Sequence, residues 1–154
     1  MQVAQEFHAP TMDLYQAIVN HASDAIIFAD RAGAIRVWNR GAEALFGYSA
    51  SEVIGRSLDV IIPERLRRAH WEGFNASVNA GVTKYAGRVL TTRAVHKDGS
   101  NLYVSLSFGL VKDRDGAVSG ALAIGRDCTV AYRTEKELRA RVAELEGKLG
   151  IASI

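Results

Sequence analysis

The chain has 154 residues, a net charge of +2 from 19 Lys and Arg against 17 Asp and Glu, and a hydrophobic fraction of 48%. A chain of this length and composition can bury a core without covalent cross-links, so intrinsic disorder is excluded as its main state. The single cysteine, Cys128, excludes a disulfide scaffold, and the near-neutral charge argues against a dedicated nucleic-acid binder.

The first predicted element is a short amphipathic helix over residues 12–22. Thr11 is a favourable N-cap, and Asp13 lies in the first turn, where the helix dipole favours an acid. Apolar residues follow at helical spacing, among them Leu14 and Ile18.

Residues 25–38 predict a β-hairpin, because a short apolar run and an alternating run flank a glycine-containing turn. Asn39 can cap the helix that follows, and Gly47 ends it. Ser49 and Glu52 fit a capping box that opens another short helix.

A longer helix is expected over residues 63–80. Pro63 suits the first turn of a helix, and Gly81 closes it. The apolar face of this helix carries Leu66, His70, Phe74 and Val78.

The second half of the chain changes to a period of two, which is typical of strands. Three such runs, separated by Asp-Gly turns, predict an antiparallel meander over Tyr85–Val95, Leu102–Val111 and Val118–Arg126. Together with the first hairpin they predict a five-stranded antiparallel sheet with the middle helices on one face, a fold of class α+β.

The tail, about residues 130–149, predicts a last helix with an apolar seam. An isolated helix of this length is marginal in water, so it needs a partner surface. Either it packs back on the domain or it forms a coiled coil between two chains. The seam steps by 4, 3 and 4 residues through Leu138, Val142, Leu145 and Leu149, and i,i+4 pairs are expected at Glu135–Arg139, Glu137–Arg141 and Glu144–Lys148.

The chain therefore divides into an N-terminal arm and helix over 1–23, a central domain over 24–129, and a dimerisation helix with its tail over 130–154. No apolar run reaches the ~18–20 residues of a membrane span. The N-terminus lacks the basic-then-apolar pattern of a signal peptide. We expect a cytoplasmic protein without membrane partners.

Several segments of the sequence resemble the PAS (S-box) family of sensory domains, over about residues 14–130. They include Trp38-Asn39, Phe46-Gly47-Tyr48, Lys97-Asp98-Gly99-Ser100 and Arg126-Asp127-Cys128-Thr129. The resemblance implies an antiparallel sheet that cradles short helices, with a ligand between sheet and helices. It also implies a homodimer that signals through its terminal helices. Such a sensor needs an output, so either it acts in trans on a kinase or regulator, or the chain is a fragment of a longer protein. The residues assigned to dimerisation and signalling are Leu14, Ile18, Asp127, Leu138, Val142, Leu145 and Leu149.

An enzyme is not expected. The chain has no Ser/His/Asp order with supporting motifs, no glycine-rich phosphate loop and no metal-ligand spacing of His and Cys. A flavin photosensor of the LOV type is not expected either, because residues 56–59, where its reactive cysteine would fall, read Arg-Ser-Leu-Asp.

His70 is the sharpest candidate for chemistry. The segment from Ile62-Pro63-Glu64 to Lys97-Asp98-Gly99 resembles the haem-binding PAS domains of oxygen-sensing histidine kinases, whose proximal haem histidine falls on His70. A neutral imidazole offers one nitrogen lone pair to haem iron while the other nitrogen donates a hydrogen bond. The alternative is a hydrogen-bonded, partly buried histidine on a helix face.

The sequence departs from that group around the expected pocket. Leu90 stands where those sensors carry a distal arginine, and Arg88 is near enough to replace it. Tyr85 is bulkier than its counterpart, so it either fills the pocket or donates a hydrogen bond to a ligand, while Lys84 keeps the positive charge of a propionate partner. The remaining candidate wall residues are Leu106, Phe108, Leu122 and Ile124.

Three functions stay open on the sequence. The first is a gas or redox sensor with b-type haem on His70. The second is a domain that binds an apolar metabolite or fatty acid in the same pocket. The third is an interaction module without a ligand, whose pocket Tyr85 and Phe108 fill.

Overall fold

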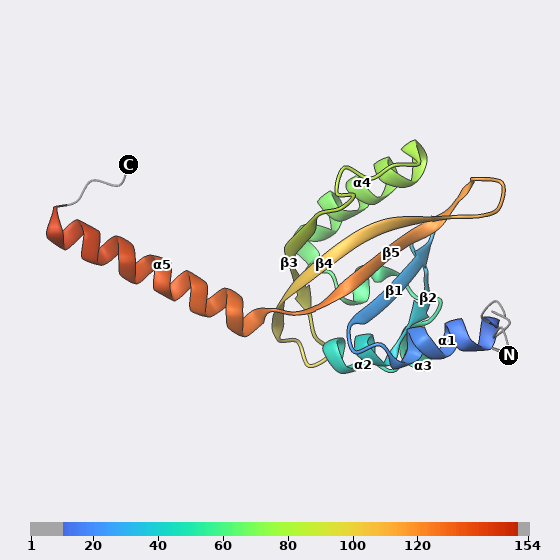
Figure 1. The fold of residues 1–154 in the computed structure, drawn as a ribbon, viewed down its shortest axis with the longest axis horizontal. Coiled ribbons are helices and arrows are strands. Elements are labelled where there is room, and N and C mark those ends of the chain that lie inside the picture. Colours follow the sequence, from blue (N-terminus) through green and yellow to red (C-terminus); the bar gives the residue numbers. More distant parts are fainter. Residues whose placement is uncertain (1–10, 151–154) are drawn as a thin grey trace, which may run out of the picture.

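Five antiparallel strands form one sheet in the order β2-β1-β5-β4-β3 (Figure 1). The computed structural model describes residues 11–150. The five-stranded antiparallel sheet and the α+β class expected from the sequence are confirmed. The strands are β1 (Ala25–Asp30), β2 (Ile35–Trp38), β3 (Val89–Val95), β4 (Asn101–Lys112) and β5 (Val118–Asp127).

The helices between β2 and β3 bury their apolar side chains against one face of the sheet. Phe46, Val53 and Phe74 from these helices share the core with Ile27 and Val104 from the sheet. The helical elements are α1 (Met12–His21), α2 (Arg40–Phe46), α3 (Ala50–Val53), the 3-10 turn η1 (Leu58–Val60), α4 (Glu64–Ala80) and α5 (Thr129–Leu149).

Local caps mark the starts and the ends of these helices where the sequence predicts them. Thr11 caps α1 through a hydrogen bond from the Leu14 N–H, and the Ser49 N–H donates to the Glu52 carboxylate at the start of α3. Gly47 and Gly81 end α2 and α4 with φ of +81° and +72°, a conformation that glycine adopts without strain.

Asn39 is buried and joins three elements. Its side-chain oxygen accepts the N–H groups of Ile26 and Ala42, at 2.8 and 2.9 Å. Its amide donates to the carbonyl oxygens of Val19 and Asp24, at 2.9 and 3.0 Å. The cap of α2 therefore also ties the end of α1 to the start of β1.

Strand β3 begins four residues later than predicted, so the expected strand over Tyr85–Val95 was wrong at its start. The Ala86 and Arg88 N–H groups donate to the carbonyl oxygens of Thr83 and Tyr85, which makes consecutive turns. Gly87, with φ of +70°, continues that turn conformation up to Val89. Turn hydrogen bonds use the backbone groups that a strand would need for the sheet.

Helix α5 extends away from the sheet (Figure 1), which excludes the interpretation that it packs back on the domain. Its seam residues Leu138, Val142, Leu145 and Leu149 are all exposed. The ion pairs Glu135–Arg139 and Glu144–Lys148 form as predicted, but Arg141 pairs with Glu144 three residues away rather than with Glu137. Within residues 11–150, no helix has the length and apolar character needed to cross a membrane.

Candidate functional site

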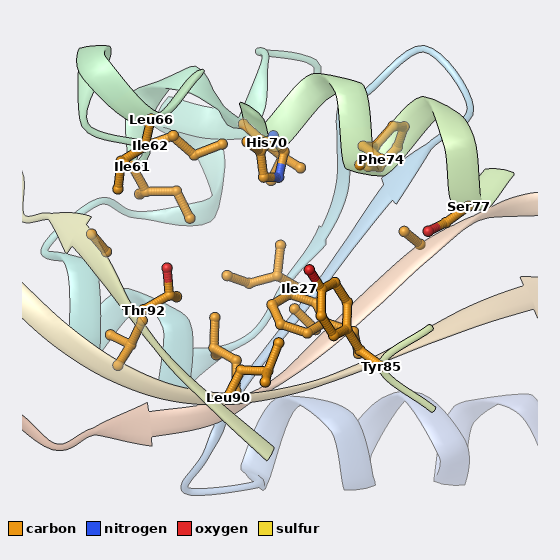
Figure 2. A pocket seen from close by; sticks show the side chains of 18 of the residues that line it. Ile27, Ile61, Ile62, Leu66, His70, Phe74, Ser77, Tyr85, Leu90 and Thr92 are labelled. Carbon is orange, nitrogen blue, oxygen red and sulfur yellow. The ribbon is translucent and has the colours of Figure 1, made fainter. Parts of the chain in front are cut away.

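A cavity of about 370 Å³ lies between α4 and the inner face of the sheet (Figure 2). This volume is within the range of small-molecule sites, and such sites are mostly apolar with a few placed polar groups. The lining here has that character. The polar side chains among the lining residues include those of His70, Ser77, Thr83, Tyr85 and Thr92.

Seven of the predicted site residues line this cavity. His70 lies on α4, and Figure 2 shows it pointing into the cavity from the side opposite Tyr85. The ring of Tyr85 packs against that of Phe108 with centroids 6.3 Å apart. The seven residues are Leu66, His70, Phe74, Tyr85, Leu90, Leu106 and Phe108.

Leu122 and Ile124, which the sequence analysis gave as wall residues, do not line this cavity. Side chains alternate between the two faces of a strand, and on β5 it is Ala121 and Ala123 that line the cavity. Leu122 borders only a smaller hollow beside it. The two alanines leave room for the cavity where larger side chains would fill it.

Three further predicted residues also lie outside the wall. Val78 is buried in the core beside the cavity. Lys84 and Arg88 are exposed in the turns before β3, and the Lys84 ammonium lies 5.0 Å from the centre of the Tyr85 ring. These two residues therefore lie close to the cavity along the chain, but their side chains do not line it.

His70 has a buried nitrogen without a partner. Its Nδ1 is buried and makes no hydrogen bond to any residue in the range 11–150. Burial lowers the pKa of the imidazole, and the charge of Asp59 opposes this shift. A buried polar atom without a partner is uncommon in folded proteins, and a redox role or a bound water or ion can account for one. The alternative from the sequence was a hydrogen-bonded histidine, but Nδ1 of His70 makes no such bond within residues 11–150.

The residues present fit a haem group better than a bare metal ion. Among the described residues, no group of three or more His, Cys, Asp or Glu side chains could hold a metal ion. Haem needs one protein ligand to its iron and apolar walls for the ring. His70 can supply the first, and Leu66, Phe74, Leu106 and Phe108 supply the second.

Sequence reasoning missed several wall residues and one polar contact. Ile27, Ile61, Ile62 and Thr92 line the cavity. The isoleucines lie in apolar runs that predicted core rather than site, so no local signal separates the two. The contact is a hydrogen bond from Trp71 Nε1 to Asp59 Oδ1 at 2.8 Å, which joins α4 to η1.

The predicted signalling residues lie at both ends of the domain. Leu14 and Ile18 are exposed on α1. Asp127 ends β5, and its Oδ1 accepts the Thr129 N–H at 2.7 Å, which starts α5. Burial raises the pKa of the neighbouring Cys128 thiol, which favours its protonated form.

The family model for the PAS fold matches residues 13–128. The oxygen sensor protein DosP of Escherichia coli K12 is 29% identical over 86% of this chain, which spans 15% of that protein. The sensor protein FixL of Bradyrhizobium diazoefficiens is 27% identical over 87% of this chain, which spans 25% of that protein. The crystal structure of a PAS domain from Colwellia psychrerythraea is similar with a TM-score of 0.66 and 24% identity, over 77% of this chain and 97% of that one.

Proposed function

The chain belongs to the PAS family and is a sensory signal-transduction module, and from this premise we propose that it binds b-type haem through His70 to sense a gas or a redox change. The observation that carries the proposal is the His70 imidazole, which points into an apolar cavity and has a buried Nδ1 without a partner. The similarity to an oxygen sensor over 86% of the chain supports the same conclusion.

Each group of residues has a distinct task in this proposal. His70 holds the iron, and its lowered pKa keeps the imidazole neutral, as a ligand must be. The apolar walls exclude water from the cavity. Lys84 and Arg88 offer positive charge to the propionates from the turns before β3. When bound, haem supplies an iron centre that changes oxidation state and binds diatomic gases.

The test is an absorption spectrum of the purified protein, as isolated and during a hemin titration. We expect a sharp Soret band that moves on reduction and on adding carbon monoxide. The band should be lost in His70→Ala and kept in His96→Ala, because His96 lies at the β3–β4 turn outside the cavity. A flat spectrum, or hemin binding that both variants share, would contradict the proposal.

A second candidate function is the binding of an apolar metabolite or fatty acid. The cavity volume of about 370 Å³ and the replacement of the expected arginine by Leu90 favour it. In that case the protein is colourless, its melting temperature rises with the ligand by mass action, and His70→Ala has little effect. If neither hemin nor an apolar ligand shifts the melting temperature, the domain is a ligand-free interaction module.

We also propose that the output passes through α5 as a homodimer, towards a kinase or regulator in trans. The exposed seam from Leu138 to Leu149 supports this, because apolar residues at heptad spacing favour a coiled coil. Sedimentation of the full chain and of a truncation after Asp127 tests it. The full chain should be a dimer and the truncated chain a monomer, and the same number of chains per particle in both would contradict the proposal. Cytoplasmic location and the lack of enzymatic activity stay predictions.

A further inference from the structure

Trp71 follows His70 on α4, but its indole is not part of the cavity wall. The ring edge lies directly on Gly33 in the turn between β1 and β2. A Cβ atom at Gly33 would lie 2.3 Å from Cη2 of Trp71 and 2.4 Å from Cζ3, so no side chain fits there. Gly33 is buried and has φ of +80°, which also favours glycine.

The other end of the same indole is held by Asp59. Nε1 donates to the Asp59 carboxylate at 2.8 Å, and hydrogen bonds to ionised acceptors are stronger than neutral ones. Asp59 is fixed in turn, because Arg67 Nη2 donates to its carbonyl oxygen at 3.2 Å and Arg67 Nε donates to that of Ile62 at 3.2 Å. Trp71 is thus clamped between two elements that lie outside α4.

The clamped indole contacts two residues of the cavity wall. The His70 ring meets it at 4.7 Å between centroids with an interplanar angle of 82°, and the Phe74 ring meets it at 5.2 Å and 74°. Edge-to-face contacts of this kind favour defined ring orientations. With Nδ1 unpartnered, the His70 imidazole has no hydrogen bond at that atom to fix its rotation. Packing restrains it instead, closely against Trp71 at 4.7 Å and more distantly against Phe74 at 6.1 Å between centroids.

We infer that Trp71, clamped between Gly33 and Asp59, is a positioning residue that sets the orientation of the His70 imidazole in the cavity. The inference rests on the proposed role of His70 as the haem ligand and deepens it. On this inference, a contact outside the cavity governs how tightly His70 binds haem. Groups that orient a metal ligand typically change affinity by about 10–100-fold when removed.

The comparison of Asp59→Ala with Asp59→Asn isolates the hydrogen bond. Both variants remove the negative charge, but only asparagine keeps an acceptor for the indole N–H. Trp38→Phe is the control for a general loss of stability, because Trp38 is a buried tryptophan whose Nε1 donates to the Tyr48 carbonyl oxygen at 3.0 Å and whose side chain is absent from the cavity lining.

The first readout needs no haem. In the full-length protein, the His70 Cε1–Hε1 signal in a ¹H–¹³C correlation spectrum, assigned with His70→Gln, reports the ring environment. We expect one sharp signal in the wild type, Asp59→Asn and Trp38→Phe, and a shifted, broadened or doubled signal in Asp59→Ala. A signal that is the same in Asp59→Ala and Asp59→Asn would overturn the inference.

The second readout is the hemin titration. We expect Asp59→Ala to weaken hemin binding by about 10–100-fold and to broaden the Soret band, while Asp59→Asn and Trp38→Phe keep both. Equal hemin affinity and band shape in Asp59→Ala and Asp59→Asn would overturn the inference and leave the proposed function standing. If His70 shows the expected signal pattern but no variant binds hemin, the positioning role holds and the haem proposal fails.

Discussion

The ring of Tyr103 on β4 stacks on the ring of Tyr132 in α5, with centroids 3.8 Å apart and planes inclined by 17°. The same junction is tied by backbone contacts, because the Tyr103 N–H donates to the Thr129 hydroxyl at 2.9 Å and the Cys128 N–H donates to the Tyr103 carbonyl oxygen at 2.8 Å. Helix α5 extends away from the domain, so these contacts at its first turn set its direction relative to the sheet (Figure 1).

The stack predicts the effect of Tyr132→Ala. An aromatic pair contributes about 0.5–1.5 kcal/mol, so the folded domain should remain while the first turn of α5 opens more often. Hydrogen exchange should become faster at Thr129–Arg133 and stay unchanged in β1 and β5. Tyr15→Ala is the matched control, because Tyr15 is exposed on α1. Equal exchange at the start of α5 in both variants would show that the stack does not anchor the helix.

Asn39→Ala should be among the most damaging single substitutions in the domain. It removes the N-cap of α2 and leaves buried hydrogen-bond donors and acceptors of α1 and β1 without a partner. Together these losses should lower the free energy of unfolding by about 2–4 kcal/mol. The midpoint of urea unfolding measures this loss. Asn79→Ala, at an exposed position of α4, should change stability by less than about 0.5 kcal/mol. Similar losses in both variants would refute a joining role for Asn39.

Acid should weaken the link between α3 and the β3–β4 turn. The hydrogen bond from Lys97 is the largest of the causes that lower the pKa of Glu52 to about 2 from its ordinary 4.5. Because the folded-state pKa is lowered, the stabilisation is present above pH 4.5 and is lost as the pH falls towards 2.

Lys97→Met should therefore be less stable than the wild type at pH 7, and the difference should shrink between pH 4.5 and pH 2. Urea unfolding across this pH range measures it, with Lys97→Arg as the variant that keeps the charge. A difference that does not vary with pH would exclude Glu52 as the partner that matters.

Ala123→Leu should close the cavity. The added carbons point from β5 into the space that Ala123 now leaves open, so hemin or an apolar ligand should no longer bind while the domain stays folded. Ser107→Leu adds comparable bulk on the outer face of β4, opposite Ile124 in register, and should leave ligand binding intact. Ligand binding is measured by titration after circular dichroism confirms the fold of both variants. Equal ligand affinity of Ala123→Leu and the wild type would place the ligand elsewhere.

The sequence by itself determined most of the elements and the caps of the helices, but not the start of β3. Thr11, Asn39, Gly47 and Gly81 act as helix caps within a few residues of their own positions, so their signals are local. The two hairpin turns of the second half and the period of two were equally local, and they predicted the five-stranded sheet. Two sequence signals pointed to His70. It lies in the segment that resembles the haem-binding PAS domains, and it lies on the apolar face of a predicted helix.

Only the tertiary structure decided which residues make the site. Strand periodicity says that Ala121 and Leu122 face opposite ways, but the pairing of β5 with β1 and β4 decides which of the two faces α4. The clamp on Trp71 joins Gly33, Asp59 and Trp71, which are far apart along the chain and carry no shared local pattern. Such contacts depend on packing between elements, and packing is a property of the folded chain rather than of any short segment.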